Sequence, residues 1–354
     1  MKKVYIVLED GHVFEGERFG AEGEAVGEFV FTTGMCGYVE TLTDPTYYGQ
    51  IVMHTFTLIG NYGIMEEDFE CDKSYIKAYV VREWCDAPSN FRCQYTLDEY
   101  LKKQGIVGVC GVDTREITRI IRDNGVMNAK IVDDPSTVDF DELKAYKITD
   151  AVATVSTKEA YTVESEAHSR KVAVVDFGKT KGTVAELTKR GCDVTVVPFN
   201  TSAEEILSLG ADGIVLSNGP ADPKDNMAAV EEIKKLIGKA PMLGIGLGHQ
   251  LAALALGGDT VKLQYGHRGA NQPVKSTESG KTYITSQNHG YEVVAKSVEC
   301  GFESFINAND GTCEGMKYAD KLIITTQFQP EACISPFNTH YVYDEFITMM
   351  GGND

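Results

Sequence analysis

The sequence predicts a two-domain α/β protein in which an α+β domain precedes a domain built on a parallel sheet. The chain has 354 residues, roughly twice the usual length of one domain. In its second half, β-branched apolar runs alternate with helical stretches, a pattern typical of parallel strands joined by crossover helices. In its first half, short strand-like runs are broken by turn glycines instead. We therefore expect an N-terminal domain over residues 1–150, a linker over 151–170 and a second domain over 171–354.

The N-terminal domain begins with two strands and contains one well-marked helix. VYIVLEDGHVFEG is typical of a strand, a Glu-Asp-Gly turn and a second strand. The spacing predicts a helix over Thr114–Asn124, with Asp113 and Glu116 as a capping box and Gly125 as its stop. Its apolar stripe is formed by Ile117, Ile120 and Ile121. We interpret its basic face (Arg115, Arg119 and Arg122) as solvated surface in preference to a partner surface.

The second domain has four apolar runs that predict buried parallel strands. These runs are KVAVVDFG, DVTVVPF, GIVLSNG and PMLGIG. Helices are expected between them at 182–191, 202–210 and 224–239, and Ser202 with Glu205 forms a second capping box. The polar stretch 151–170 lacks periodicity, which indicates a connection between domains. Ligands of open α/β sheets bind beyond the carboxyl ends of the strands, so a site is expected after these runs.

Composition and charge narrow the class of protein. Apolar residues make up 43% and charged residues 24% of the chain, as in ordinary globular proteins. The formal net charge of −19 excludes nucleic acid and anionic membranes as expected partners. Nine cysteines without a CxxC pair indicate reduced thiols and predict neither a disulfide framework nor a metal site. With no signal peptide and no membrane span expected, the predicted location is the cytoplasm.

A glycine-rich turn follows the fourth run, at Gly244-Ile245-Gly246-Leu247-Gly248. A strand, such a turn and a helix together form the frame of a nucleophile elbow, in which the central residue attacks the substrate. The central residue here is Gly246, which has no side chain. By itself such a turn is equally compatible with phosphate binding or close packing.

The other motifs of the chain, and their order, favour an enzyme-type elbow over a simple glycine-rich turn. Together they resemble the class I glutamine amidotransferase domain of carbamoyl phosphate synthetase small subunits, with a flavodoxin-like parallel sheet. The motifs are Gly244-Ile245-Gly246-Leu247-Gly248-His249-Gln250, Leu216-Ser217-Asn218-Gly219-Pro220, Gly266-His267-Arg268-Gly269, Gln287-Asn288-His289-Gly290 and Pro330-Glu331-Ala332. The first half resembles that family's N-terminal domain, through Leu8-Glu9-Asp10-Gly11, Leu42-Thr43-Asp44-Pro45, Gln50-Ile51-Val52, Ile59-Gly60-Asn61 and Asp113-Thr114-Arg115.

The resemblance implies glutamine hydrolysis by a Cys, His and Glu triad, with the ammonia passing to a large synthetase subunit. This chain departs from the triad twice: Gly246 stands in place of the Cys and Gln329 in place of the His, so only Glu331 remains. No cofactor or metal is expected in this chain, because the family's ATP and Mg²⁺ belong to the large subunit. The product would serve pyrimidine or arginine biosynthesis.

The resemblance also implies a glutamine pocket with two oxyanion donors. The implied binding residues are Gly219, Leu247, Gln250, Asn288, Gly290 and Tyr291, with Thr46 from the N-terminal domain. The backbone N–H groups of Leu247 and Gly219 are the implied oxyanion donors, and these do not depend on the lost side chains. Ala221 stands where the family usually has glycine, which would impair binding if that position needs a positive φ.

Three functions remain open at this point. The chain is an active glutaminase subunit, a degenerate small subunit that still docks the large subunit, or a stand-alone glutamine-binding or sensor module. We favour the second, with the N-terminal domain as the main docking surface. Cys36 and Cys333 are weak candidates for a substitute nucleophile, since neither is on the elbow. We interpret His249, His267 and His289 as packing or capping residues.

Overall fold

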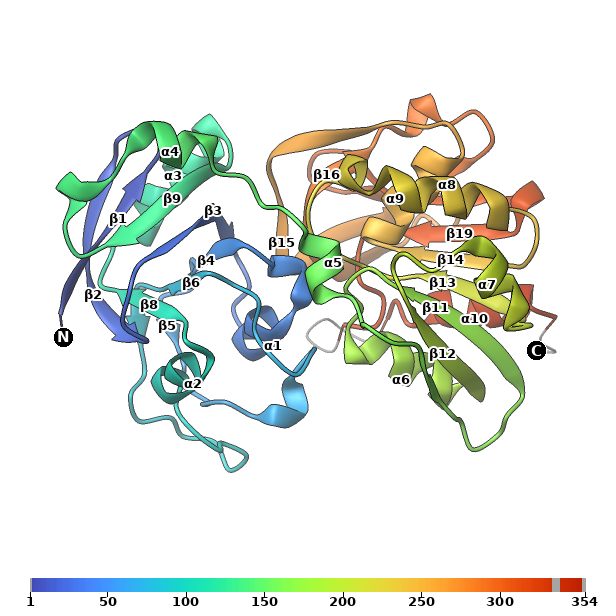
Figure 1. Cartoon of the computed structure of the whole chain (residues 1–354), viewed down its shortest axis with the longest axis horizontal. Helices are drawn as coiled ribbons and strands as arrows, with labels where there is room; N and C mark the ends of the chain where they lie inside the picture. The colour runs from blue at the N-terminus through green and yellow to red at the C-terminus, as the bar shows by residue number, and fades with distance from the viewer. Residues whose placement is uncertain (1, 333–337, 352–354) are drawn as a thin grey trace. The chain divides into compact units, whose positions relative to one another are not determined.

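The chain divides into two compact units, which are described separately. The structure is a computed structural model that describes residues 2–332 and 338–351. Unit 1 consists of residues 1–151 and 264–269, and unit 2 of residues 152–263 and 270–354 (Figure 1). The mixed α/β architecture predicted from the sequence is confirmed.

Unit 1 is built around a closed barrel in which parallel and antiparallel pairs are mixed. In barrel order its strands are β1 (Lys3–Leu8), β2 (Val13–Gly20), β8 (Val107–Cys110), β6 (Ala78–Val80), β4 (Gln50–His54), β3 (Ala25–Thr32) and β9 (Met127–Val132). A separate parallel pair is formed by β5 (Leu58–Ile59) and β7 (Glu83–Trp84). The helices of this unit are α1 (Tyr38–Thr43), α2 (Leu97–Gln104), α3 (Thr114–Asn124) and α4 (Phe140–Ala145).

Helix α3 has the predicted bounds and the predicted core face. The Asp113 carboxylate accepts a hydrogen bond from the backbone N–H of Glu116 at 3.0 Å and so caps the helix. Its three isoleucines are buried and pack with one face of the barrel strands. On the exposed basic face, Arg119 pairs with Glu116 at 3.2 Å and Arg122 with Asp123 at 2.9 Å. These local pairings are typical of a solvated helix surface.

Residues 264–269, although distant in sequence, are part of unit 1. The Gln264 carbonyl accepts from Val126 N–H at 2.8 Å, and its side-chain amide donates to the carbonyls of Arg122 and Asp123 at 3.1 Å each. Arg268 in the same segment is buried. A fragment that ends near residue 150 therefore lacks a piece of its own unit, and docking experiments require the full chain.

Unit 2 contains a ten-stranded sheet whose central part is parallel. In sheet order its strands are β10 (Tyr161–Val163), β12 (Cys192–Pro198), β11 (Arg170–Asp176), β13 (Gly213–Leu216), β14 (Met242–Ile245), β19 (Ile323–Thr326), β18 (Cys313–Tyr318), β17 (Phe302–Asn307), β15 (Thr260–Ser276) and β16 (Thr282–Val293). The stretch predicted as a linker differs from that expectation, because it contains α5 (Ala151–Val155) and edge strand β10.

Three helices of unit 2 lie close to the predicted ranges: α6 (Lys181–Lys189), α7 (Ala203–Ser208) and α8 (Met227–Leu236). The helix expected after the glycine-rich turn is α9 (Leu247–Ala255), and α10 (Tyr341–Met349) was not predicted. The capping box of Ser202 and Glu205 is present in both directions. The predicted helix over 224–239 is shorter, because Pro223–Asn226 forms a 3₁₀ turn before α8. No described helix has the length and apolarity needed to cross a membrane.

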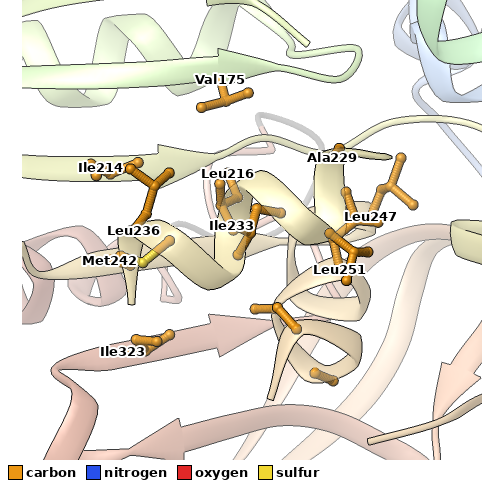
Figure 2. Packing of buried hydrophobic residues seen from close by; sticks show 14 of the residues in the cluster. Val175, Ile214, Leu216, Ala229, Ile233, Leu236, Met242, Leu247, Leu251 and Ile323 are labelled. Carbon is orange, nitrogen blue, oxygen red and sulfur yellow. The ribbon is translucent and has the colours of Figure 1, made fainter. Parts of the chain in front are cut away.

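Helix α9 is held against the sheet by a large apolar core. Figure 2 shows Leu247 and Leu251 of α9 next to Ala229 of α8, with Leu216 of β13 in the same cluster. Both leucines are at most 2% exposed. This packing fixes the start of α9, and therefore the turn between β14 and α9, in one position.

Candidate active site

The turn between β14 and α9 has the backbone of a nucleophile elbow. Gly246 has φ 54° and ψ −109°, a conformation that side chains rarely adopt. Its N–H donates to the carbonyl of Thr326 at the end of β19, at 2.8 Å. Gly248 must be glycine, because a Cβ there would overlap with the carbonyl of Leu216. The elbow geometry is thus present while the residue at its apex carries no reacting atom.

The side chain of Asn218 lies against the elbow. Asn218 follows β13, the parallel neighbour of β14, and is buried. Its Oδ1 accepts hydrogen bonds from the N–H of Gly219 at 2.8 Å and from the N–H of Leu247 at 3.1 Å. These are the two donors that the sequence resemblance implies for an oxyanion. A Cβ built on Gly246 would overlap with this same Asn218 carboxamide.

Gln329 lies just beyond the other neighbour of β14. It is three residues past the end of β19, is buried, and donates from its backbone N–H to the carbonyl of Ser286 at 3.0 Å. Gly246 and Gln329, the two positions where this chain departs from the implied triad, therefore follow adjacent parallel strands, β14 and β19. Both lie beyond the carboxyl ends of their strands, where ligands of open α/β sheets bind.

The carboxylate of Glu331 is buried among hydroxyl groups. Its Oε1 accepts from Thr180 at 3.1 Å and from Thr183 at 2.8 Å, and its Oε2 accepts from the Tyr343 hydroxyl at 3.1 Å. Burial raises the pKa of Glu331 above its ordinary value, and the hydroxyl hydrogen bonds oppose this effect. These three hydrogen-bond partners of Glu331 come from the residue that precedes α6 (Thr180), from α6 itself (Thr183) and from α10 (Tyr343). None of the three is a histidine.

The buried Glu331 predicts a pH-dependent stability difference. Because its pKa is raised in the folded state, its stabilising contribution is present below its unfolded pKa and is lost as the pH rises through its folded pKa. We expect the unfolding free energy of Glu331→Gln, which stays neutral, to increase relative to that of the wild type as the pH rises from 4 to 8. Urea unfolding followed by circular dichroism at both pH values measures the difference in unfolding free energy between the variant and the wild type. The exposed Glu299→Gln controls for the loss of one carboxylate, and a difference that does not change with pH would contradict the prediction.

The other predicted glutamine-binding residues of unit 2 lie on α9 and β16. The Gln250 amide donates to the carbonyl of Tyr291 at 2.8 Å and to Gln327 Oε1 at 2.9 Å, so it links α9 to two neighbouring segments. Asn288 and Gly290 precede Tyr291 on β16, and Asn288 is buried. Their role in glutamine binding stays a prediction.

The remaining predicted residues lie elsewhere. Thr46 belongs to unit 1, where its hydroxyl donates to Asp44 Oδ1 at 2.7 Å, and its role at the pocket stays a prediction. His249 is buried, lies 2.8 Å from the Thr325 hydroxyl, and has its pKa lowered to about 3 by burial, as suits a packing residue. Cys36 is an exposed free thiol of unit 1, and Cys333 lies outside the described residues.

Ala221 has a φ of 74°, so this position does require a left-handed backbone. A side chain in that region costs about 1–2 kcal/mol, and glycine avoids the cost but gains entropy in the unfolded chain. We expect Ala221→Gly to raise the unfolding free energy by about 0.5–1 kcal/mol. Ala228→Gly, at an exposed position within α8, is the matched control and should lower it by a similar amount. Parallel urea titrations compare them, and equal losses in both variants would contradict the prediction.

Sequence reasoning did not assign a role to Asn218 or to the three hydroxyl partners of Glu331. Asn218 was available as part of Leu216-Ser217-Asn218-Gly219-Pro220. The missing side chain at Gly246 was the signal that could have pointed to Asn218. It leaves space beside two N–H donors, and the neighbouring loop carries a carboxamide that can fill this space. No comparable signal linked Thr180, Thr183 or Tyr343 to Glu331.

The parallel sheet, the elbow and Glu331 define a class I glutamine amidotransferase domain, and residues 173–349 match the family described as glutamine amidotransferase class-I. Residues 6–131 match the family described as carbamoyl-phosphate synthase small chain, CPSase domain. The carbamoyl phosphate synthase small chain of Clostridium perfringens is 50% identical over 347 residues, covering 98% of this chain and 99% of that protein. Those of Bacillus thuringiensis (98% of this chain, 96% of that protein) and Listeria monocytogenes (100% and 98%) are 49% and 46% identical. The chain therefore belongs to the carbamoyl phosphate synthase small chain family.

Proposed function

We propose that this chain is a small subunit that no longer hydrolyses glutamine but still docks a large synthetase subunit, which then makes carbamoyl phosphate from free ammonia. The observation that carries the proposal is the elbow, where Gly246 keeps the φ and ψ of the turn without any side chain. A covalent thioester needs a thiolate at this point, and glycine offers no atom to form it. Gln329 cannot replace a histidine, because a side-chain amide neither accepts nor releases a proton near neutral pH.

Docking is proposed because the chain has kept its other parts. The N-terminal half matches its family over residues 6–131, and the identity to relatives extends over nearly the whole chain. A small subunit that lost hydrolysis but kept both domains is expected if its complex with the large subunit remained useful to the cell. We infer that unit 1 makes the main contact with the large subunit. ATP and Mg²⁺ would be bound by the large subunit, so this chain is proposed to need no cofactor of its own.

Reconstitution with a large synthetase subunit tests the proposal. The full chain is co-expressed with the large subunit, purified through a tag on one partner, and assayed for carbamoyl phosphate with glutamine or with ammonium as nitrogen donor. The control is a relative whose elbow reads G-I-C-L-G-H-Q. We expect co-purification for both small chains, ammonium-driven synthesis for both, and glutamine-driven synthesis for the relative alone.

The two competing functions give different results. Glutamine-driven synthesis at the control's rate would show an active glutaminase subunit. Failure of the folded full chain to co-purify with any large subunit, combined with saturable glutamine binding, would favour a stand-alone glutamine-binding or sensor module. Either result would overturn the proposal.

A further inference from the structure

We propose that the Asn218 side chain is an internal ligand that closes the glutamine amide site of this chain. The inference rests on the proposed assignment of this pocket as a disabled glutamine site, and adds that the pocket excludes glutamine as well as failing to hydrolyse it. The group that Asn218 presents is a carboxamide, the same chemical group as the end of a glutamine side chain. Its oxygen satisfies the N–H groups of Gly219 and Leu247, the two implied oxyanion donors.

The hydrogen-bond geometry favours a stable closed state. Both contacts, at 2.8 and 3.1 Å, are of ordinary hydrogen-bond length. Leu247 is the first residue of α9, so its N–H has no partner within the helix and needs an acceptor. The partial positive charge of a helix N-terminus favours the electronegative oxygen of a carboxamide at this place. Asn218 is only 3% exposed, so water competes poorly for the same donors.

The lost nucleophile explains why Asn218 can take this place. A Cβ at residue 246 would overlap with Oδ1, with Cγ and closely with Nδ2 of Asn218. Any side chain at the elbow apex therefore excludes the observed Asn218 rotamer. With glycine at the apex and without the Asn218 carboxamide, the space would be a void beside the buried Leu247 N–H and the partly buried Gly219 N–H, both without this acceptor, which is unfavourable for packing and for hydrogen bonding. Loss of the nucleophile and closure of the site are thus one structural change.

Glutamine binding to the full-length wild type and to three variants tests the inference. Asn218→Ala removes the carboxamide, Asn218→Asp keeps its shape and its acceptor oxygen, and Asn309→Ala is a surface control on an exposed turn. Calorimetric titration with L-glutamine measures the affinity, and NMR of the labelled protein follows the amide signals of Gly219 and Leu247. We expect Asn218→Ala to bind glutamine at least about tenfold more tightly than the wild type, as two freed donors allow.

The amide signals distinguish the mechanism from a general change in stability. Glutamine should shift both signals in Asn218→Ala and leave them in place in the wild type, in Asn218→Asp and in Asn309→Ala. Equal glutamine affinity of the wild type and Asn218→Ala would overturn the inference, as would tight binding by Asn218→Asp. Folded Asn218→Ala that does not bind would also overturn it. Binding without hydrolysis leaves the proposed function intact, whereas hydrolysis by the wild type would refute that function.

Discussion

Ammonia release from glutamine by this chain, alone or with a large subunit, is expected to be roughly 10⁶-fold slower than in a relative with an intact triad. The magnitude follows from serine proteases, in which loss of the nucleophile or the base costs about 10⁶ in turnover. In those enzymes about 10³–10⁴ of acceleration over water remains through the oxyanion hole and binding. Here the implied donors already hold Asn218 Oδ1, so even this residual acceleration should be small.

A coupled assay for free ammonia, run over hours at high enzyme concentration, measures this rate. The matched controls are Cys36→Ser and Cys333→Ser in the same chain, because these cysteines are the candidates for a substitute nucleophile. Neither change should alter the trace rate. Release at the rate of an intact relative, abolished by one of these two substitutions, would contradict the prediction and identify another attacking thiol.

Local sequence signals predicted much of the fold. Helix α3 has its predicted bounds because the Asp113 cap, the isoleucine stripe and Gly125 all act within a few residues of one another. The Ser202 capping box formed for the same reason. Edge strand β10 could not be predicted from the sequence, because its three exposed residues are too few to show a period and pair with β12 about 30 residues further on. The assignment of residues 264–269 to unit 1 also depends on long-range packing alone.

In the candidate site, too, local features could be predicted from the sequence and long-range contacts could not. The resemblance pointed to Gly246, Gln329 and Glu331, and the elbow backbone at Gly246 follows from the strand, the glycines and the helix around it. It also indicated that Ala221 would matter if its φ were positive, as it is. The position of Asn218 depends on two loops separated by 29 residues in the chain, and no local sequence signal determines how these loops lie against each other. Glu331 likewise contacts α6 about 150 residues earlier.

Restoring the nucleophile alone should not restore the enzyme. At residue 246 a Cβ would overlap with the Asn218 carboxamide, so Gly246→Cys should force Asn218 away and free both donors. The thiol would still lack a base, and without one only a few per cent is thiolate at pH 7. We expect Gly246→Cys to react with an electrophilic glutamine analogue but to show almost no turnover. Adding Gln329→His should raise turnover by about 10²–10⁴, the usual contribution of general acid–base catalysis.

The rescue requires Glu331 to orient the new histidine, and this provides the sharpest control. Oε2 of Glu331 accepts one hydrogen bond from Tyr343, and a carboxylate oxygen can accept a second, from an imidazole N–H. Adding Glu331→Gln to the double variant should therefore remove most of the gain, because triad members act as a unit and their effects are not additive. Steady-state glutaminase assays on the single, double and triple variants, each checked for folding by circular dichroism, decide the matter. Full activity of Gly246→Cys alone would show that the base is not at residue 329, and an unchanged rate after Glu331→Gln would show that Glu331 does not orient the new histidine.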